Sequence, residues 1–169
     1  MESLTATRRG ALATLLAWCA APAWSLDAPA GRVMLTITGD IEQRNAPAGA
    51  QFDLAMLEKL PVRSYATRTP WFPEPRKFTG VLLRDLLGAV GAKGQIATAV
   101  ALNDYRVDIP VAEAQRHDLI VAWLLDDKPM AVRDKGPLVV MYPFDDRPEL
   151  KTALNYSRAA WQLKQLDVR

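Results

Sequence analysis

Hydrophobic and polar positions alternate in several short runs of the chain, the pattern of half-buried strands. In the run 33–38, Val33, Leu35 and Ile37 fall on one face. Comparable runs, rich in β-branched and aromatic residues, predict further strands at 62–69, 97–102, 105–109 and 119–125. The apolar run 138–142 shows no alternation, so we expect a central strand that is buried on both faces.

Helical spacing is confined to short segments. Residues 81–90 place five apolar side chains on one stripe and are followed by a glycine, which predicts a helix with a left-handed cap. Residues 53–60 begin with an aspartate that can cap a first turn and are followed by a proline, so a second helix is expected there. A third short helix is expected over 110–116, because proline is favoured at a helix start.

Turns and interruptions complete the pattern. The Asn-Asp pair at 103–104 predicts a hairpin turn, and residues 130–132 are a candidate short partner for the strand 119–125. Three prolines within 70–75 predict an irregular loop. In 160–168 the apolar phase slips by one position, which predicts a β-bulge near Lys164 and Gln165. These elements predict an α+β fold, a β-rich single domain with short helices between the strands.

The first 25 residues have the order of a secretory signal peptide. Arg8 and Arg9 precede an apolar run that is too short to span a bilayer, and small residues follow near Ser25. We therefore expect cleavage near Ser25, a mature domain over 26–169 and a periplasmic location. The paired arginines also fit a twin-arginine export signal, whereas in an ordinary leader they only supply positive charge.

Composition narrows the chemistry that the mature domain can perform. The chain carries 21 Lys and Arg against 19 Asp and Glu, so it offers no electrostatic reason to expect nucleic acid as a partner. No stretch after the leader reaches the ~20 apolar residues of a transmembrane helix. The one cysteine, Cys19, lies in the leader and the one histidine is His117, so we expect neither thiolate catalysis nor a zinc centre. No haem motif, nucleophile elbow or phosphate-binding glycine loop occurs.

Short motifs follow one another along the chain in a specific order. They are Thr67-Arg68-Thr69-Pro70-Trp71, Phe78-Thr79-Gly80-Val81-Leu82-Leu83-Arg84-Asp85-Leu86-Leu87, Asn103-Asp104-Tyr105, Ile109-Pro110, Lys128-Pro129-Met130, Arg133-Asp134-Lys135-Gly136-Pro137-Leu138, Tyr142-Pro143 and Trp161-Gln162-Leu163-Lys164. Together they resemble the oxidoreductase molybdopterin-binding domain, the domain of sulfite oxidase and its bacterial relatives. The resemblance covers about residues 33–168, and it implies the sulfite-oxidase type of fold, with mixed sheets, over 26–169.

The resemblance also implies molybdopterin as the cofactor, with one departure from the family pattern. In that family a cysteine on the strand before the Trp-containing loop binds molybdenum. Thr67 or Thr69 stands near that position here, depending on the register. A hydroxyl cannot replace a thiolate, because soft sulfur suits this metal and an alcohol stays protonated at neutral pH. We therefore expect only the part of the cofactor site that binds the pterin and the phosphate to be present in this chain.

A pocket for this flat, anionic group needs cationic donors, polar groups and an aromatic wall. Residues of that chemistry on predicted strand ends or loops are Arg68, Trp71, Asn103, Tyr105, Arg133, Lys135, Arg158 and Trp161. Trp71 is the strongest candidate, because a proline-rich loop cannot easily bury it. Arg133 and Lys135 equally fit a solvated turn, Asn103 fits turn chemistry alone, and Trp161 fits a core position.

Three functions fit these observations. The first is a periplasmic molybdopterin-dependent oxidoreductase-like protein that binds a pterin-type or other small anionic, heterocyclic ligand. The second is a non-catalytic ligand-binding module on the same scaffold, since fold does not determine function. The third is an adaptor whose loop around Trp71 docks onto a periplasmic or membrane protein partner.

Overall fold

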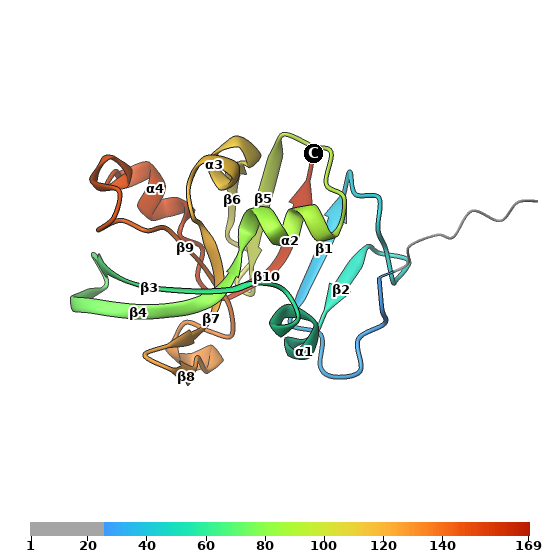
Figure 1. Cartoon of the computed structure of the whole chain (residues 1–169), viewed down its shortest axis with the longest axis horizontal. Helices are drawn as coiled ribbons and strands as arrows, with labels where there is room; N and C mark the ends of the chain where they lie inside the picture. The colour runs from blue at the N-terminus through green and yellow to red at the C-terminus, as the bar shows by residue number, and fades with distance from the viewer. Residues whose placement is uncertain (1–25) are drawn as a thin grey trace, which may run out of the picture.

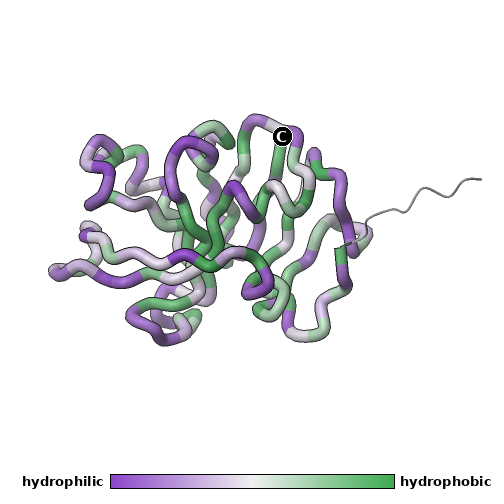
Figure 2. Tube along the Cα trace, in the orientation of Figure 1, coloured by the Kyte–Doolittle hydropathy of each residue, from purple (hydrophilic) through white to green (hydrophobic). Residues whose placement is uncertain are grey.

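The computed structural model describes residues 26–169. One mixed sheet and one antiparallel sheet share a single hydrophobic core. The predicted signal peptide over 1–25 lies outside the described residues. Short helices cover the sheets, so the prediction of a β-rich α+β domain is confirmed (Figure 1). Apolar segments run through the middle of the molecule, and polar ones gather at the turns (Figure 2).

The first sheet contains the first and the last strand of the described chain. Its strand order is β2 (Ala50–Phe52), β1 (Leu35–Gly39), β10 (Leu163–Val168), β5 (Ile96–Ala101) and β6 (Arg106–Pro110). β1 and β10 run parallel and the other pairs are antiparallel, which makes the sheet mixed. The predicted bulge is confirmed, because the register of β10 against β5 shifts between Leu163 and Gln165. The predicted hairpin between β5 and β6 is also confirmed, with Asp104 in the left-handed conformation.

The second sheet is antiparallel. It contains β3 (Val62–Thr69), β4 (Phe72–Leu82), β7 (Ile120–Leu125) and β8 (Lys128–Pro129), while β9 (Val139–Met141) pairs with the first half of β7. The partner expected at 130–132 is wrong in position: β8 turns back directly after Asp126 and Asp127. Both residues have positive φ, as a tight two-residue hairpin turn requires.

The irregular loop expected over 70–75 is wrong. Pro70 and Trp71 form a two-residue turn, and β4 already begins at Phe72. The sheet tolerates the next two prolines because the β3–β4 register jumps there, from Thr67 opposite Arg76 to Thr69 opposite Phe72. β7 joins β4 only from Phe78 onward, so the prolines lie in a bulge with a free edge. We call the turn at residues 69–72 the hairpin tip.

Four short helices connect the strands. They are α1 (Leu54–Glu58), α2 (Leu83–Ala89), α3 (Val111–Arg116) and α4 (Ala153–Arg158), with single 3-10 turns at Val132–Asp134 and Pro148–Leu150. The carboxylate of Asp53 caps α1 by accepting the Met56 N–H, as predicted. The helix expected over 81–90 starts two residues late, because Val81 and Leu82 still pair with β7 as the end of β4.

β9 is buried as predicted, but it does not pair with two full strands. One edge pairs with β7, and the other meets the segment before β10. Val140 N–H donates to the carbonyl of Ala160, Leu163 N–H donates to the carbonyl of Leu138, and Val139 forms a bridge with Trp161. This contact joins the second sheet to the first and places Trp161 between them.

We expect Gly80→Ala to destabilise the fold by at least about 2 kcal/mol, because a Cβ there would overlap the carbonyl of Val121 on the adjacent strand. Gly88→Ala is the matched control. Gly88 lies exposed on α2, where an added Cβ would meet no atom within 4 Å, so alanine there should stabilise by about 0.5 kcal/mol. Urea unfolding of both variants measures this difference. Equal midpoints would contradict the close approach of β4 and β7.

Candidate functional site

A cleft of about 430 Å³ opens between the hairpin tip, the β5–β6 turn, the 3-10 turn after β8 and the segment before β10. Of the eight candidates for the cofactor pocket, six line it together, and five of these are Trp71, Asn103, Tyr105, Arg133 and Lys135. Trp161 lines it as well. Because these residues come from four separate segments, only the fold brings them together. We call this cavity the aromatic cleft.

The wall of the aromatic cleft is a cluster of steeply inclined rings. Trp71 packs edge-on against Trp161, with ring centroids 5.3 Å apart, and against Tyr156 of α4 at 6.2 Å. Trp161 also contacts Phe72 and the buried Phe78, so it serves both the cleft and the core. Trp71 is half-buried and turned inward at the hairpin tip. Trp161 was predicted to be either a pocket residue or a core residue, and its side chain is both.

Two cations stand at the cleft without strong protein partners. The Nζ atom of Lys135 lies 5.6 Å from the ring centroid of Trp161, over its face. The side chain of Arg133 is 88% exposed, and its one ion pair is with the adjacent Asp134 at 3.4 Å. An exposed pair of this kind contributes little, so the guanidinium remains available to an anion. The solvated-turn interpretation therefore suits Arg133 better than Lys135.

The polar candidates at the β5–β6 turn are partly used by the fold. Asn103 Oδ1 accepts the backbone N–H of Tyr105 at 3.2 Å, which is turn chemistry. The hydroxyl of Tyr105 donates to the carbonyl of Ser157 at 3.0 Å and so ties this turn to α4. The ring of Tyr105 is held in place at the mouth of the cleft, with 44% of the residue exposed.

Gln162 lies in one of the ordered motifs but was not among the predicted site residues, and it holds three walls of the cleft together. Its side-chain Nε2 donates to the carbonyl of Val132 at 2.8 Å, and its N–H donates to the carbonyl of Lys135 at 3.0 Å. Its own carbonyl accepts the N–H of Leu102 at 2.9 Å. Gln162 and Lys135 both have positive φ, at 53° and 70°. Residue type alone does not mark a glutamine for this role. The Thr152 cap indicates where α4 begins, but it does not mark Tyr156 as a site residue.

The two threonines near the family's cysteine position do not line the aromatic cleft. Thr67 is fully buried, and its hydroxyl accepts the N–H of Asp145 at 3.1 Å. Thr69 is 8% exposed, and its hydroxyl has no partner among the described residues. Residues 26–169 contain no cysteine, and the same residues hold no group of three His, Cys, Asp or Glu side chains that could bind a metal.

Arg68 and Arg158 also lie apart from the cleft lining. Arg68 donates its N–H to Asp145 at 2.9 Å, and its guanidinium is 3.7 Å from the same carboxylate. Arg158 is largely buried, with Nη1 2.6 Å from Glu113 and Nε donating to the carbonyl of Asp108. Burial and the adjacent Glu113 raise the pKa of Tyr142, which donates to that carboxylate. Arg158 therefore anchors α4 and supports the cleft from behind.

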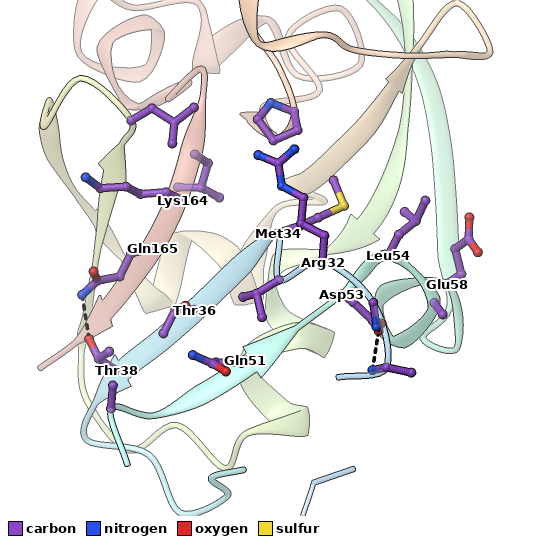
Figure 3. Close-up of a pocket in the computed structure, with 18 residues that line it drawn as sticks. Arg32, Met34, Thr36, Thr38, Gln51, Asp53, Leu54, Glu58, Lys164 and Gln165 are labelled. Carbon is purple, nitrogen blue, oxygen red and sulfur yellow. Dashed lines mark hydrogen bonds between the residues drawn. The ribbon is translucent and has the colours of Figure 1, made fainter. Parts of the chain in front are cut away.

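A larger cavity of about 940 Å³ lies over the outer face of β1, β2 and β10 (Figure 3). Several of its polar side chains are engaged by the fold: Gln165 donates to Thr38, Thr38 donates to Asp167, and Asp53 accepts three backbone N–H groups. None of the predicted site residues lines it. We therefore place the candidate site in the smaller aromatic cleft, where unpaired charge and aromatic surface converge. Among residues 26–169 no helix is long and apolar enough to cross a membrane.

Comparison with known proteins is consistent with this architecture. The family model of the oxidoreductase molybdopterin binding domain matches residues 50–144, a stretch that includes Trp71, Tyr105 and Lys135. No curated protein matches the chain. Among solved structures it is similar to the sulfane dehydrogenase SoxCD from Paracoccus pantotrophus, with a TM-score of 0.59 and 14% identity. The match covers 79% of this chain and 37% of that chain, so our chain spans little more than a third of its neighbour.

We expect the Asp145 carboxylate to hold the hairpin in place. It accepts from Lys151 at 2.8 Å and from the Arg68 N–H, and these contacts lower the pKa of Asp145. Asp145→Ala should cost about 2 kcal/mol at pH 7, and Asp145→Asn about 1 kcal/mol, because asparagine keeps an acceptor for the N–H.

The pH dependence follows from the lowered pKa of Asp145. A carboxyl whose pKa falls on folding stabilises the protein fully above its unfolded pKa of about 3.9. That contribution is lost as pH drops through the lower folded pKa. The stability difference between wild type and Asp145→Asn, measured by urea unfolding from pH 7 to pH 2.5, should shrink below about pH 4. A constant difference over this range would exclude the charged contact.

Proposed function

The chain belongs to the oxidoreductase molybdopterin-binding domain family, and from this premise we propose that it binds a flat, anionic heterocycle of the pterin type in the aromatic cleft. One observation carries the proposal: aromatic rings, two available cations and polar groups from four separate segments line a single cavity. Its volume of about 430 Å³ falls within the usual range for small-molecule sites.

The residues present suit the organic part of a pterin cofactor. Trp71 and Trp161 offer ring surfaces for a flat heterocycle, and Tyr105 stands at the mouth. Lys135 and Arg133 supply positive charge for a phosphate or carboxylate, which arginine and lysine bind through charge-assisted hydrogen bonds. Both cations lack a strong protein partner, so a ligand anion would not have to displace an internal ion pair.

The residues do not suit a molybdenum centre anchored by the protein. The hydroxyl of Thr67 is buried and already accepts a backbone N–H, and that of Thr69 is an alcohol. A neutral hydroxyl is a poor substitute for the thiolate that binds this metal. We therefore favour a ligand-binding member of the family over a thiolate-anchored redox enzyme. The dehydrogenase activity in the name of SoxCD is a property of that protein, because a similarity at 14% identity indicates a shared fold and not a shared activity.

The inward packing of Trp71 favours a ligand wall over the docking-loop alternative. Its ring contacts Trp161 and Tyr156, and the residue is half-buried at a tight turn. An anchor residue for a protein partner would gain most if it stood free in solvent before docking. We accordingly propose a small ligand, and not a partner protein, as the occupant of the aromatic cleft.

Titration of the purified protein with pterin-6-carboxylate, followed by tryptophan fluorescence, should show saturable binding. Lys135→Gln should weaken it about five- to tenfold, and Arg133→Gln about two- to fivefold, because each removes one charge-assisted contact. Arg63→Gln is the matched control, since Arg63 is an exposed cation at the far end of β3. Salt should weaken wild-type binding more than that of Lys135→Gln. Absence of saturable binding, or an equal loss in Arg63→Gln, would overturn the assignment.

We also propose that the protein is exported and works in the periplasm, on the basis of the charged and apolar order of residues 1–25. Cell fractionation should recover a periplasmic form whose first residue lies near Leu26. Changing Arg8 and Arg9 together to lysine keeps the positive charge but removes a twin-arginine pair. Export blocked by this change would identify the twin-arginine route, whereas normal export would identify an ordinary leader. Recovery of the uncleaved chain in the cytoplasm would refute the proposal.

A further inference from the structure

The indole N–H of Trp161 has no hydrogen-bond partner, although the residue lines the aromatic cleft. Its Nε1 atom has less than 1 Å² of accessible surface and no acceptor within reach among the described residues. Thr69, at the base of the hairpin tip, carries a second such atom, its Oγ1. Thr69 pairs with Phe72, whose ring contacts Trp161. Residues 26–169 contain three buried polar side-chain atoms without a partner. Two of them belong to Thr69 and Trp161, which meet through Phe72 of the hairpin tip.

An unpartnered buried donor is unfavourable, because it has lost its hydrogen bonds to water without replacement. The surroundings of Trp161 give no reason to keep such a donor. Its packing partners are the rings of Trp71, Phe72 and Phe78 and the ammonium group of Lys135, none of which accepts a conventional hydrogen bond in the ring plane. The apolar contacts of the ring do not require this N–H, so the donor itself adds nothing to the packing.

We propose that Trp161 determines the specificity of the aromatic cleft: its indole N–H selects ligands that carry a ring nitrogen or ring carbonyl as an acceptor. This inference rests on the proposed function and narrows its ligand class. Lys135 and Arg133 would accept any anion of suitable size, and the ring surfaces would accept any flat group. Among the donors of the cleft, the N–H of Trp161 is the buried one that has no protein partner, so it can distinguish a heterocycle from an aromatic hydrocarbon of the same charge and size.

The ligand reaches this N–H by displacing part of the aromatic cluster. Trp71 lines the same cavity, packs edge-on against Trp161 and sits on the two-residue turn of the hairpin tip. Its side chain can swing away without breaking a hydrogen bond of its own ring, since neither the ring contact to Trp161 nor that to Tyr156 is polar. The heterocycle would then lie against Trp161, with the displaced Trp71 ring still forming part of the wall.

Two probes of matched charge test the inference, pterin-6-carboxylate and 2-naphthoate, because only the pterin carries ring acceptors. Trp161→Phe should weaken binding of pterin-6-carboxylate about five- to tenfold, the effect of one lost hydrogen bond, and leave 2-naphthoate within about twofold. Trp123→Phe is the control, since Trp123 is a buried tryptophan of β7 that does not line the cleft. Equal weakening of both probes in Trp161→Phe would overturn the specificity role while the proposed binding function stands.

A measurement on the wild-type protein covers the case in which Trp161→Phe fails to fold. In ¹⁵N-labelled protein, the indole N–H signal of Trp161 should move downfield when pterin-6-carboxylate saturates the site, and it should not move in this way with 2-naphthoate. A signal that stays in place with bound pterin would overturn the inference. If neither probe binds the wild type, both the inference and the proposed function fail.

Discussion

The contact between β9 and the segment before β10 is the interaction on which the site depends. Hydrogen bonds from Val140 to Ala160 and from Leu163 to Leu138 join the second sheet to the first. The chain reaches β10 through Gln162, whose left-handed conformation turns the backbone after Trp161. Without this junction the two sheets would present Trp71 and Tyr105 on separate surfaces. The aromatic cleft is therefore a consequence of how the sheets are joined.

Much of this architecture follows from local patterns in the sequence. Seven strands, the β5–β6 hairpin, the cap of α1 and the bulge in β10 were predictable, because alternation, turn residues and phase slips act over a few residues. Strands β2 and β4 were not predicted, and the expected partner of β7 was misplaced. The stretch 70–75 was not. Prolines normally interrupt strands, and only the register shift against β3 creates the bulge that tolerates Pro73 and Pro75. The start of α2 was similarly decided by pairing of Leu82 with Ile120 on a distant strand.

The residues of the candidate site also fall into those that the sequence predicts and those that it does not. Chemistry alone selected Trp71, Tyr105 and Lys135, since flat anions call for rings and cations. Arg158 has the same chemistry, but the fold uses it to neutralise Glu113, and an ion pair of this kind cannot be read from residue types. Gln162 and Tyr156 escaped notice for the opposite reason, because their roles arise from long-range hydrogen bonds and packing. Side-chain chemistry thus finds candidates, and only the tertiary contacts decide which are free to bind.

The absence of a cysteine from residues 26–169 and the presence of Trp161 in the cleft together constrain the proposed function. The ring of Trp161 packs against Phe72 and Phe78 and so contributes to the core, whereas its unpartnered N–H is unfavourable in the free protein. The same scaffold holds Lys135 over that indole and leaves Arg133 exposed, an arrangement that repels other cations and contributes little to folding. The exposed charges of Lys135 and Arg133 are solvated in the free protein and remain available to an anion. An anionic heterocycle in the cleft would pair with these charges and supply an acceptor to the buried indole N–H, which favours binding as the role of the cleft.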